Sequence, residues 1–403
     1  MRYFLGFKNI QYFHLWILAF FYLPQSFFGF YLYDSRHAFL FLGIALVSVF
    51  GYIFFYTYVF GGRGLRAFVN RPGRWSVDVG NFSYLIFGFY FLLIAYVVAT
   101  SEQIALLMVF EGASVDELAQ SREMFLRTRV GWEVIIPYIN ALFVMALLPY
   151  SIASLFYTKH KFRFYFLVLF LFCLTLTLEK SVAILAIAPL IILAVNSKRG
   201  SKGFWIIVFL VAFIAAVSFL ARGGGQVDVD VGGEGALSMP EKYQILKCDA
   251  QICYLFNRVT WIPYATAVDW LTYQEDVLGG GYLLGQSIGV VALIFNVPKI
   301  NMERDVFEFQ WGQNASGTGS SNTVYFIDAF VNFSWFGVIL YSAVVALFVK
   351  ILAISDNVPV KCAAFASLFY LGFNSLPPMF FSGGLIIVLL LALLFRHNNR
   401  SNV

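Results

Sequence analysis

The chain has 403 residues, of which 60% are apolar, 19% aromatic and 12% charged, and its formal net charge is +5. A soluble domain carries roughly 25% charged residues, so this chain has too little polar surface to cover a water-soluble globule. Its apolar residues gather in runs of about 17–25, the length of a spanning helix. They lack the period-two alternation of membrane β-barrel strands. The composition therefore predicts an integral membrane protein.

Ten apolar runs qualify as spanning helices. They cover about residues 10–33, 38–60, 81–101, 135–157, 164–178, 181–196, 204–221, 324–349, 362–376 and 383–395. No small-residue cleavage site follows the first run, so a span is expected there rather than a signal peptide. The expected fold is an all-α polytopic membrane protein of about ten transmembrane helices, a single integral membrane domain over residues 1–403. An even number of spans places both termini on one side.

The distribution of charge predicts which side that is. With the N-terminus inside, the inside segments hold 16 of the 27 Lys and Arg residues but only two of the 22 acidic ones, Asp78 and Asp356. Basic residues in short loops mark the cytoplasmic side. Both termini are therefore expected in the cytoplasm, with residues 102–134 and 222–323 as the two large external segments.

The first external segment is expected to contain a helix. Residues 114–117 carry a capping-box pattern at its start, and the helix would continue through Arg122, Arg127 and Arg129. Arg122 and Arg129 are seven residues apart and would project on nearly one face. Two interpretations stay open: Arg127 forms a surface ion pair with Glu123, or the guanidinium groups face an anion near the membrane surface.

A tight hairpin at Glu179, Lys180 and Ser181 joins two short spans. In one interpretation Lys180 lies in a simple turn and extends its ammonium group to the membrane boundary. In the other it points into a cavity and meets an anionic group, because short or broken spans around a charge often border a site.

The second external segment has distinct parts. Residues 222–240 are rich in Gly, Asp and Val and predict a loop, whereas residues 241–273 predict an aromatic amphipathic helix suited to the bilayer surface. Residues 282–297 are apolar but short, which favours a re-entrant or interfacial segment. Cys248 and Cys253 lie five positions apart, so a disulfide is expected if this side is oxidising.

The sequence lacks the phosphate-loop, HExxH, GxSxG and CxxC motifs. His37 is the one histidine expected clearly outside, so a carboxylate base, or none, is favoured over a histidine base. The outer face offers Arg and Lys, which suit phosphate, together with aromatic and amide side chains, which suit sugars. A lipid-linked diphosphate sugar would use all of these groups.

Four stretches carry a resemblance to a known family. They are residues 258–263 (Arg-Val-Thr-Trp-Ile-Pro), 282–287 (Tyr-Leu-Leu-Gly-Gln-Ser), 296–299 (Asn-Val-Pro-Lys) and 333–338 (Phe-Ser-Trp-Phe-Gly-Val). Together they resemble the large external loop of Wzy-type polymerases, which join O-antigen and capsule oligosaccharide repeat units. The resemblance implies a GT-C-like arrangement of helices around an external loop. Lys180 stands where many members have the Arg of a Gly-Ser-Arg-like turn, which keeps the cation but loses the planar fork.

The resemblance also implies a reaction. A glycan on polyprenyl diphosphate is the donor, and a hydroxyl of a second lipid-linked repeat unit attacks its anomeric carbon. Polyprenyl diphosphate leaves, so cations supply the main electrostatic stabilisation, and neither a metal nor another cofactor is expected. The residues expected to bind the diphosphate are Arg258, Arg222 and Lys180, with Arg122, Arg127 and Arg129 sharing the role. Asp328 and Glu133 are the candidates for a catalytic carboxylate that orients or deprotonates the acceptor.

Two other functions compete with the polymerase. An O-antigen ligase would resemble it but typically has an external histidine near its site, and a lipid-linked oligosaccharide flippase would show paired repeats and short loops. The expected partners are the two lipid-linked oligosaccharides, membrane lipid and, as a further candidate, a chain-length-regulating copolymerase; no nucleic acid is expected. The expected location is a bacterial inner membrane, with the large loop in the periplasm.

Overall fold

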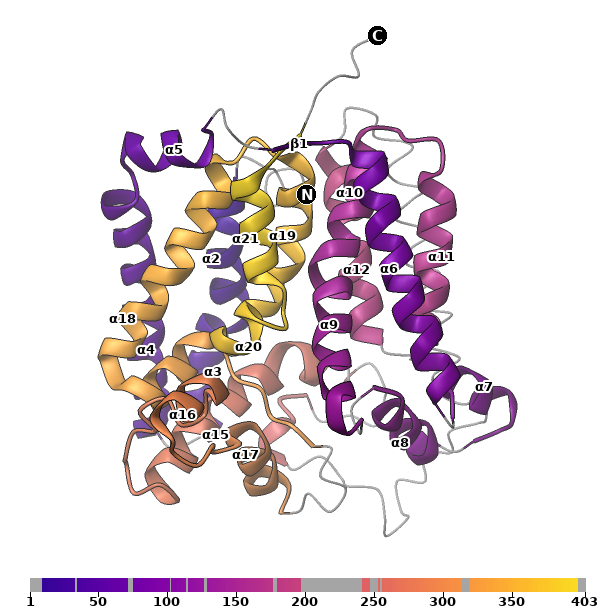
Figure 1. The fold of residues 1–403 in the computed structure, drawn as a ribbon. Helices are drawn as coiled ribbons and strands as arrows, with labels where there is room; N and C mark the ends of the chain where they lie inside the picture. Colours follow the sequence, from indigo (N-terminus) through magenta and orange to yellow (C-terminus); the bar gives the residue numbers. More distant parts are fainter. Residues whose placement is uncertain are drawn as a thin grey trace.

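The computed structural model describes residues 9–32, 35–71, 75–101, 103–113, 115–126, 129–176, 180–196, 241–246, 253, 256–312 and 319–397. Over these residues the chain is an α-helical bundle (Figure 1). Five of its helices are long and apolar enough to cross a membrane: residues 10–31, 36–59, 79–100, 131–157 and 325–354. An α-helical membrane protein is therefore supported by the length and composition of its helices.

Four of these five helices contain a local irregularity, and the third of the five does not. The first is α2 (Ile10–Phe21) followed by α3 (Leu23–Leu32), and the second is α4 (Ser35–Phe54) extended by the π-turn η2 (Phe55–Val59). The third is the unbroken α6 (Val79–Thr100). The fourth consists of η3 (Gly131–Ile135), α9 (Ile136–Leu142), η4 (Phe143–Leu147) and α10 (Leu148–Tyr157). The fifth is α18 (Tyr325–Ile354).

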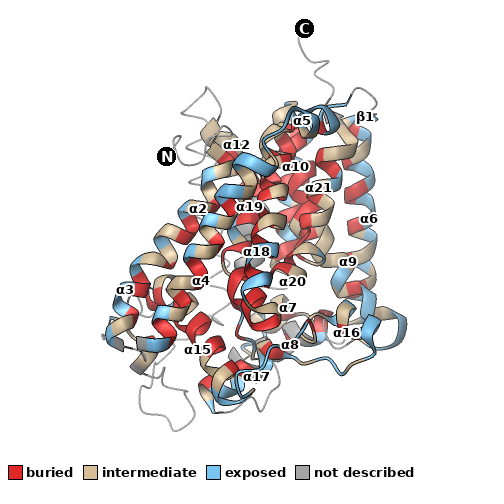
Figure 2. Cartoon of the chain, turned by 90° about the vertical axis from the view of Figure 1, so that its left-hand side faces the viewer, coloured by how far each residue is buried: buried red, intermediate tan, exposed pale blue. Residues whose placement is uncertain are grey.

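Four predicted spans coincide with shorter helices. These are α11 (Arg163–Thr175), α12 (Lys180–Asn196), α19 (Val358–Leu371, followed by α20, Leu376–Phe380) and α21 (Leu385–Leu394). Their lengths run from 10 to 17 residues, below the roughly 20 residues that cross a hydrocarbon core. The predicted span at 204–221 lies outside the described residues. In the interior, α4 packs along α18, and α19 packs against α10 and α12; Figure 2 shows buried residues gathered where α10, α18 and α19 meet.

The non-spanning elements lie at two opposite ends of the bundle (Figure 1). One end holds α5 (Arg63–Val69) and a parallel pair of short strands, β1 (Trp75–Val77) and β2 (Phe395–His397). The other end holds α7 (Ala105–Phe110), α8 (Val115–Leu126), α15 (Ile262–Asp276), α16 (Gly289–Phe295) and α17 (Met302–Trp311), together with the short turns η5 (Glu241–Tyr243) and η6 (Asn257–Trp261). The described parts of both predicted external segments thus lie at one end.

Helix α18 is broken into two arms that lie side by side. Its backbone leaves the helical region at Phe333 and at Ser334, where φ is 58° and ψ is −155°. The Oγ atom of Ser48 is 2.7 Å from the hydroxyl of Tyr325 and 3.2 Å from that of Ser342. In a straight helix Tyr325 and Ser342 would be about 25 Å apart. The first arm therefore folds back along the second, so the run predicted as a span from residue 324 is bent at Ser334 rather than straight.

The aromatic segment predicted to lie on the bilayer surface is instead part of the core. Trp261, Tyr264 and Trp270 are all buried, and the ring of Tyr264 meets that of Phe41 on α4 with centroids 4.9 Å apart. The prediction was wrong because these aromatic side chains pack against apolar side chains inside the bundle. Full burial there removes more of their apolar surface from water than a contact on one side at the bilayer surface would. At its far end α15 is fixed to α4 by Glu275, which pairs with Arg36 and His37.

The apolar segment at 282–297 contains the short helix α16. Val290, Leu293, Ile294 and Phe295 on this helix are all at least half exposed. The backbone N–H groups of Leu283 and Leu284 donate to the carbonyl groups of Val331 and Asn332, at 3.1 and 2.9 Å. The segment is thus attached to the break in α18 and has an exposed apolar side; its re-entrant or interfacial position stays a prediction.

Candidate functional site

A cavity of about 420 Å³ lies where the non-spanning elements meet the ends of the bundle. We call it the aromatic cavity. Its walls come from η5, η6, α15, α17, the segment before α18, and the end of α19. The lining residues are Tyr243, Arg258, Ile262, Pro263, Thr266, Phe307, Gln310, Trp311, Ser320, Ser321, Asn322 and Phe373. Arg258 is the charged residue among these lining residues, so the cavity combines one cation with aromatic, amide and hydroxyl groups.

Asp269 on α15 fixes one wall of the aromatic cavity. Its side chain is 3% exposed and accepts hydrogen bonds from Lys242 Nζ at 3.0 Å, Gln310 Nε2 at 2.7 Å, and the hydroxyl of Tyr243. The indole ring of Trp311 then stacks on Tyr243, with centroids 5.6 Å apart and planes 25° apart. One buried carboxylate thereby positions three side chains from η5 and α17.

Arg258 lies in the π-turn η6. On one side of it, Asn257 is buried and exchanges two hydrogen bonds with the backbone of Leu246, at 3.0 and 2.8 Å. On the other side, Trp261 is buried and its Nε1 donates to the carbonyl of Lys242 at 2.8 Å. Single π-turns are frequent at functional sites. Here the turn buries Asn257 and Trp261 and leaves Arg258 exposed on the cavity wall.

The polar loop before α18 forms the opposite wall. The carbonyl of Ser321 accepts from Trp270 Nε1 at 2.9 Å, its N–H donates to the carbonyl of Glu303 at 2.9 Å, and its hydroxyl bonds to Gln310. The loop is therefore held by α15 and α17 together, with Ser320 and Asn322 on the cavity surface. Residues 313–318 of this loop lie outside the described residues.

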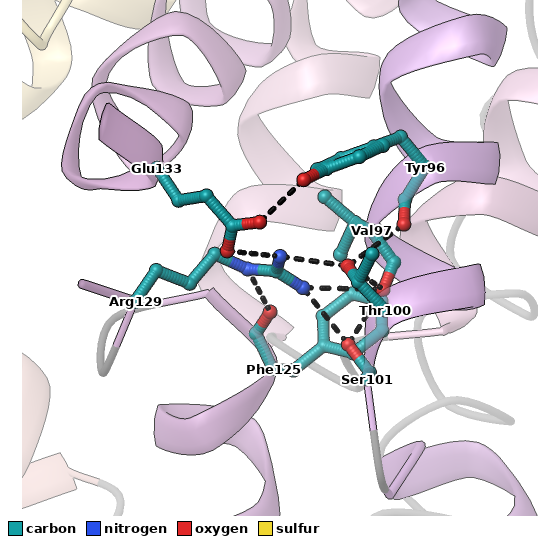
Figure 3. Close-up of polar contacts among 7 residues, drawn as sticks. All are labelled: Tyr96, Val97, Thr100, Ser101, Phe125, Arg129 and Glu133. Carbon is teal, nitrogen blue, oxygen red and sulfur yellow. Dashed lines mark hydrogen bonds and ion pairs between the residues drawn. The ribbon is translucent and has the colours of Figure 1, made fainter. Parts of the chain in front are cut away.

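A second cavity, of about 390 Å³, lies between the end of α6 and the start of the fourth spanning helix. We call it the Arg129 cavity. It is lined by Thr100, Ser101, Gln103, Met124, Arg129, Val130 and Glu133. Figure 3 shows the guanidinium group of Arg129 turned toward the end of α6 and toward Glu133.

Every N–H of the Arg129 guanidinium group is used inside the protein. Nε donates to the carbonyl of Phe125 at 3.3 Å; Nη1 donates to Thr100 and Glu133 at 2.8 and 2.9 Å; Nη2 donates to the carbonyl of Val97 and to Ser101 at 3.1 and 3.0 Å. Arginine has five such donors. Arg129 thus caps the carboxyl end of α6, and this arrangement leaves it no donor for an external anion.

The predicted helix that would carry Arg122, Arg127 and Arg129 is shorter in the structure. Helix α8 ends at Leu126, so Arg129 does not continue it, and the predicted helical alignment of Arg122 with Arg129 is wrong. Hydrogen bonds to Thr100, to the carbonyl of Val97 and to Ser101 at the end of α6 hold Arg129 in this non-helical position. Arg122 lies in α8, but its side chain is outside what the structure describes, and Arg127 lies outside the described residues.

The two candidate carboxylates have different surroundings. Glu133 lines the Arg129 cavity, and its oxygens accept from Arg129 and from the hydroxyl of Tyr96. Asp328 is buried and lines neither cavity; its Oδ1 accepts from Asn332 Nδ2 at 3.0 Å. Asn332 Oδ1 in turn accepts from the N–H of Gly285 and from Ser287 Oγ, at 3.2 and 2.9 Å. The contacts of Asp328 therefore stabilise the broken helix rather than a ligand site.

The predicted convergence of Lys180, Arg222 and Arg258 stays a prediction. Lys180 begins α12 with its side chain outside what is described, and Arg222 lies outside the described residues. Arg258 and Arg129 are both described, and they line different cavities. Cys253 is disulfide-bonded, and Cys248, its predicted partner, lies outside the described residues. Within the described chain no cluster of three or more His, Cys, Asp or Glu residues could hold a metal.

Sequence reasoning missed Asp269, Lys242 and Gln310. Asp269 did carry a signal, because an acidic residue between the apolar neighbours Val268 and Trp270 must be paired if its helix is buried. The signal was not read, because α15 was expected to lie on a surface where Asp269 could face water.

No family model, curated protein or solved structure matches this chain. Its function therefore has to be argued from its own residues and their geometry.

Proposed function

We propose that the chain is a membrane glycosyltransferase that polymerises polyprenyl-diphosphate-linked oligosaccharide repeat units, as the Wzy-type polymerases do. The observation that carries the proposal is the aromatic cavity, in which Arg258 shares one space with Trp311, Gln310 and Asn322. We further propose that about ten spans form in the inner membrane of a bacterium, with this cavity on the periplasmic side.

The position of the cavity suits a substrate with an apolar tail and a polar head. Phe373, which follows α19, and Ile262, at the start of α15, give the cavity apolar lining, whereas Gln310 on α17 and Asn322 of the polar loop give it polar lining. A polyprenyl chain could remain in lipid while its diphosphate and sugars enter this cavity.

The lining groups match the parts of such a head group. The guanidinium of Arg258 can form paired, charge-assisted hydrogen bonds with diphosphate oxygens, and we propose that Lys180 and Arg222 add further cations. The stacked pair Trp311 and Tyr243 offers aromatic surface to the apolar face of a sugar ring. Amide and hydroxyl groups from the polar loop can bond to sugar hydroxyls.

In the proposed reaction, an acceptor hydroxyl oxygen attacks the anomeric carbon of the donor and forms the new glycosidic bond. The bond from that carbon to the diphosphate oxygen breaks, and the diphosphate leaves with the electron pair. Its developing charge is stabilised by Arg258 and the other cations. The acceptor proton passes to a carboxylate. The candidates remain Glu133, which lines the Arg129 cavity, and Asp328, which is buried and lines neither cavity.

The test is complementation of a deletion strain, read as the chain-length distribution of the surface glycan. Deletion should leave single repeat units on the lipid carrier or the cell surface. Complementation with Arg258→Ala should leave mostly short chains, and Arg258→Lys, which keeps the charge without the fork, should fall between it and the wild type. Arg304→Ala is the matched control, because Arg304 is exposed on α17 and does not line the cavity.

Two outcomes would reject the proposal. Full-length chains with Arg258→Ala would show that the aromatic cavity is not the site. A deletion strain with no repeat units on its surface would indicate an O-antigen ligase or a flippase instead of a polymerase.

A further inference from the structure

The Arg129 cavity differs from the aromatic cavity in its charge. Arg129 and Glu133 pair at 2.9 Å, so the two charged residues among the described lining of this cavity balance each other. The side chain of Arg129 is 6% exposed, and that of Glu133 is 24% exposed. The cation is therefore hidden behind its partner, and the carboxylate is the charged group nearer to the cavity space.

An arginine at a membrane surface suggests an anionic ligand such as a phosphate group, but this arrangement does not suit one. An anion needs a donor, and all five guanidinium donors already have acceptors on α6, on Phe125 and on Glu133. A phosphate group would have to break several of these bonds and would also face the carboxylate of Glu133. The cavity is therefore unsuited to a phosphate group.

The groups that stay available are those that bind sugars. Gln103 is exposed on the cavity wall, and its amide can both donate and accept. Each oxygen of Glu133 already accepts one hydrogen bond, from Tyr96 or from Arg129, and can accept another. Met124 and Val130 supply apolar surface. The volume of about 390 Å³ falls in the range of roughly 300–1,000 Å³ that is usual for small-ligand pockets.

We propose that the Arg129 cavity is a binding site for a neutral, hydroxyl-bearing glycan. Its identification as the acceptor end of a lipid-linked repeat unit rests on the proposed function. Glu133 accepts a hydrogen bond from a sugar hydroxyl, Gln103 bonds to a second polar group of the glycan, and Met124 packs on the ring. Arg129 and Tyr96 act as positioning residues that hold the carboxylate in place (Figure 3).

The two cavities differ in where their guanidinium groups lie. Arg258 lines the surface of the aromatic cavity. In the Arg129 cavity, by contrast, the guanidinium group of Arg129 is fully hydrogen-bonded within the protein and caps α6. Donor diphosphate and acceptor sugar would thus be separated by charge at one end of the molecule.

The test uses the purified full-length chain in lipid nanodiscs on an array of neutral and acidic glycans. We expect neutral glycans to bind, and Gln103→Ala to weaken that binding about tenfold, the effect of losing roughly one hydrogen bond. Glu133→Gln should weaken it at least as much, because a bond to a charged acceptor is worth more. Glu111→Gln, an exposed acid at the end of α7, is the matched control and should bind like the wild type.

Gln103→Ala guards against a folding artefact, since Gln103 is exposed and its loss should leave the elution profile and thermal stability unchanged. Preferential binding of acidic glycans or of inorganic diphosphate at this site would overturn the proposal. So would a lack of binding to neutral glycans, or binding that Gln103→Ala and Glu133→Gln both leave intact. Because binding is read without polymerisation, this result is independent of the chain-length assay that tests the proposed function.

Discussion

Replacing Asp269 by alanine should destabilise the wall of the aromatic cavity strongly. Asp269 accepts three hydrogen bonds, and two of the donors, on Tyr243 and Gln310, belong to residues that are 1% and 8% exposed. Neither donor can reach water without a rearrangement of η5 or α17. The third donor, Lys242, has a side chain that is 37% exposed and can turn into solvent.

The expected magnitude follows from this difference in exposure. A buried donor left without a partner costs about 1–3 kcal/mol, so the two buried groups together cost about 4 kcal/mol. The pair with Lys242 adds less than about 1 kcal/mol, because a partly exposed ion pair is screened by solvent. Lys242→Ala should therefore cost less than about 1 kcal/mol, although it removes a charge from the same network.

The measurement is the free energy of unfolding in mixed micelles, by denaturant titration followed through tryptophan fluorescence. Asp276→Ala provides the matched control, since Asp276 ends the same helix and is exposed; it should change stability by at most about 0.5 kcal/mol. If Asp269→Ala were no worse than Asp276→Ala, or if Lys242→Ala cost as much as Asp269→Ala, the assignment of Asp269 as the buried hub would be incorrect.

Two further predictions concern the broken helix and the acidic face of α17. A Cβ atom on Gly337 would lie 2.3 Å from the carbonyl oxygen of Ala329, whereas a Cβ atom on Gly88 would meet nothing within 4 Å. Gly337→Ala should therefore destabilise the protein by about 1–3 kcal/mol, and Gly88→Ala should not destabilise it. A thermal unfolding assay measures both. Equal melting temperatures for the two variants would show that the arms of α18 do not pack so closely. Burial raises the pKa of Glu303 above its usual 4.5, while the Ser320 hydroxyl and Lys299 oppose that shift. The folded state therefore holds this proton more tightly than the unfolded state, so the contribution of Glu303 to stability should be full below about pH 4.5 and be lost as the pH rises through its folded-state pKa. Burial, and to a smaller extent the negative charge of Glu308, raises the pKa of Asp305 as well. Glu303→Gln should therefore flatten the pH dependence of stability only in part. An unchanged pH profile would exclude Glu303 as a source of that dependence.

The fold class followed from composition, but the path of individual segments did not. The run from residue 324 to 349 is apolar throughout most of its length and has no proline, so it predicts one straight span. Next to the break at Ser334, the carbonyl groups of Val331 and Asn332 accept from Leu283 and Leu284, residues about fifty positions earlier, and these bonds stabilise the bent path. Hydrogen bonds between segments so far apart in the sequence cannot be predicted from the residues next to the break.

Candidate site residues show the same limit. Residue type identified Arg258 and Glu133 as chemically suitable, and both line cavities. Residue type also grouped Arg129 with the expected phosphate-binding cations, but its contacts within the protein do not support a phosphate-binding role. The difference is decided by acceptors on α6, which lie about thirty residues away in sequence.

The sequence by itself determined that the chain is a helical membrane protein and where its first four long helices lie. Those properties depend on apolar content summed over windows of about twenty residues, which neighbours in sequence supply. Only the tertiary structure decided which polar groups are consumed within the protein and which remain for a ligand. That distinction depends on hydrogen bonds between distant segments, because a donor such as the guanidinium of Arg129 becomes unavailable once the fold brings it enough acceptors.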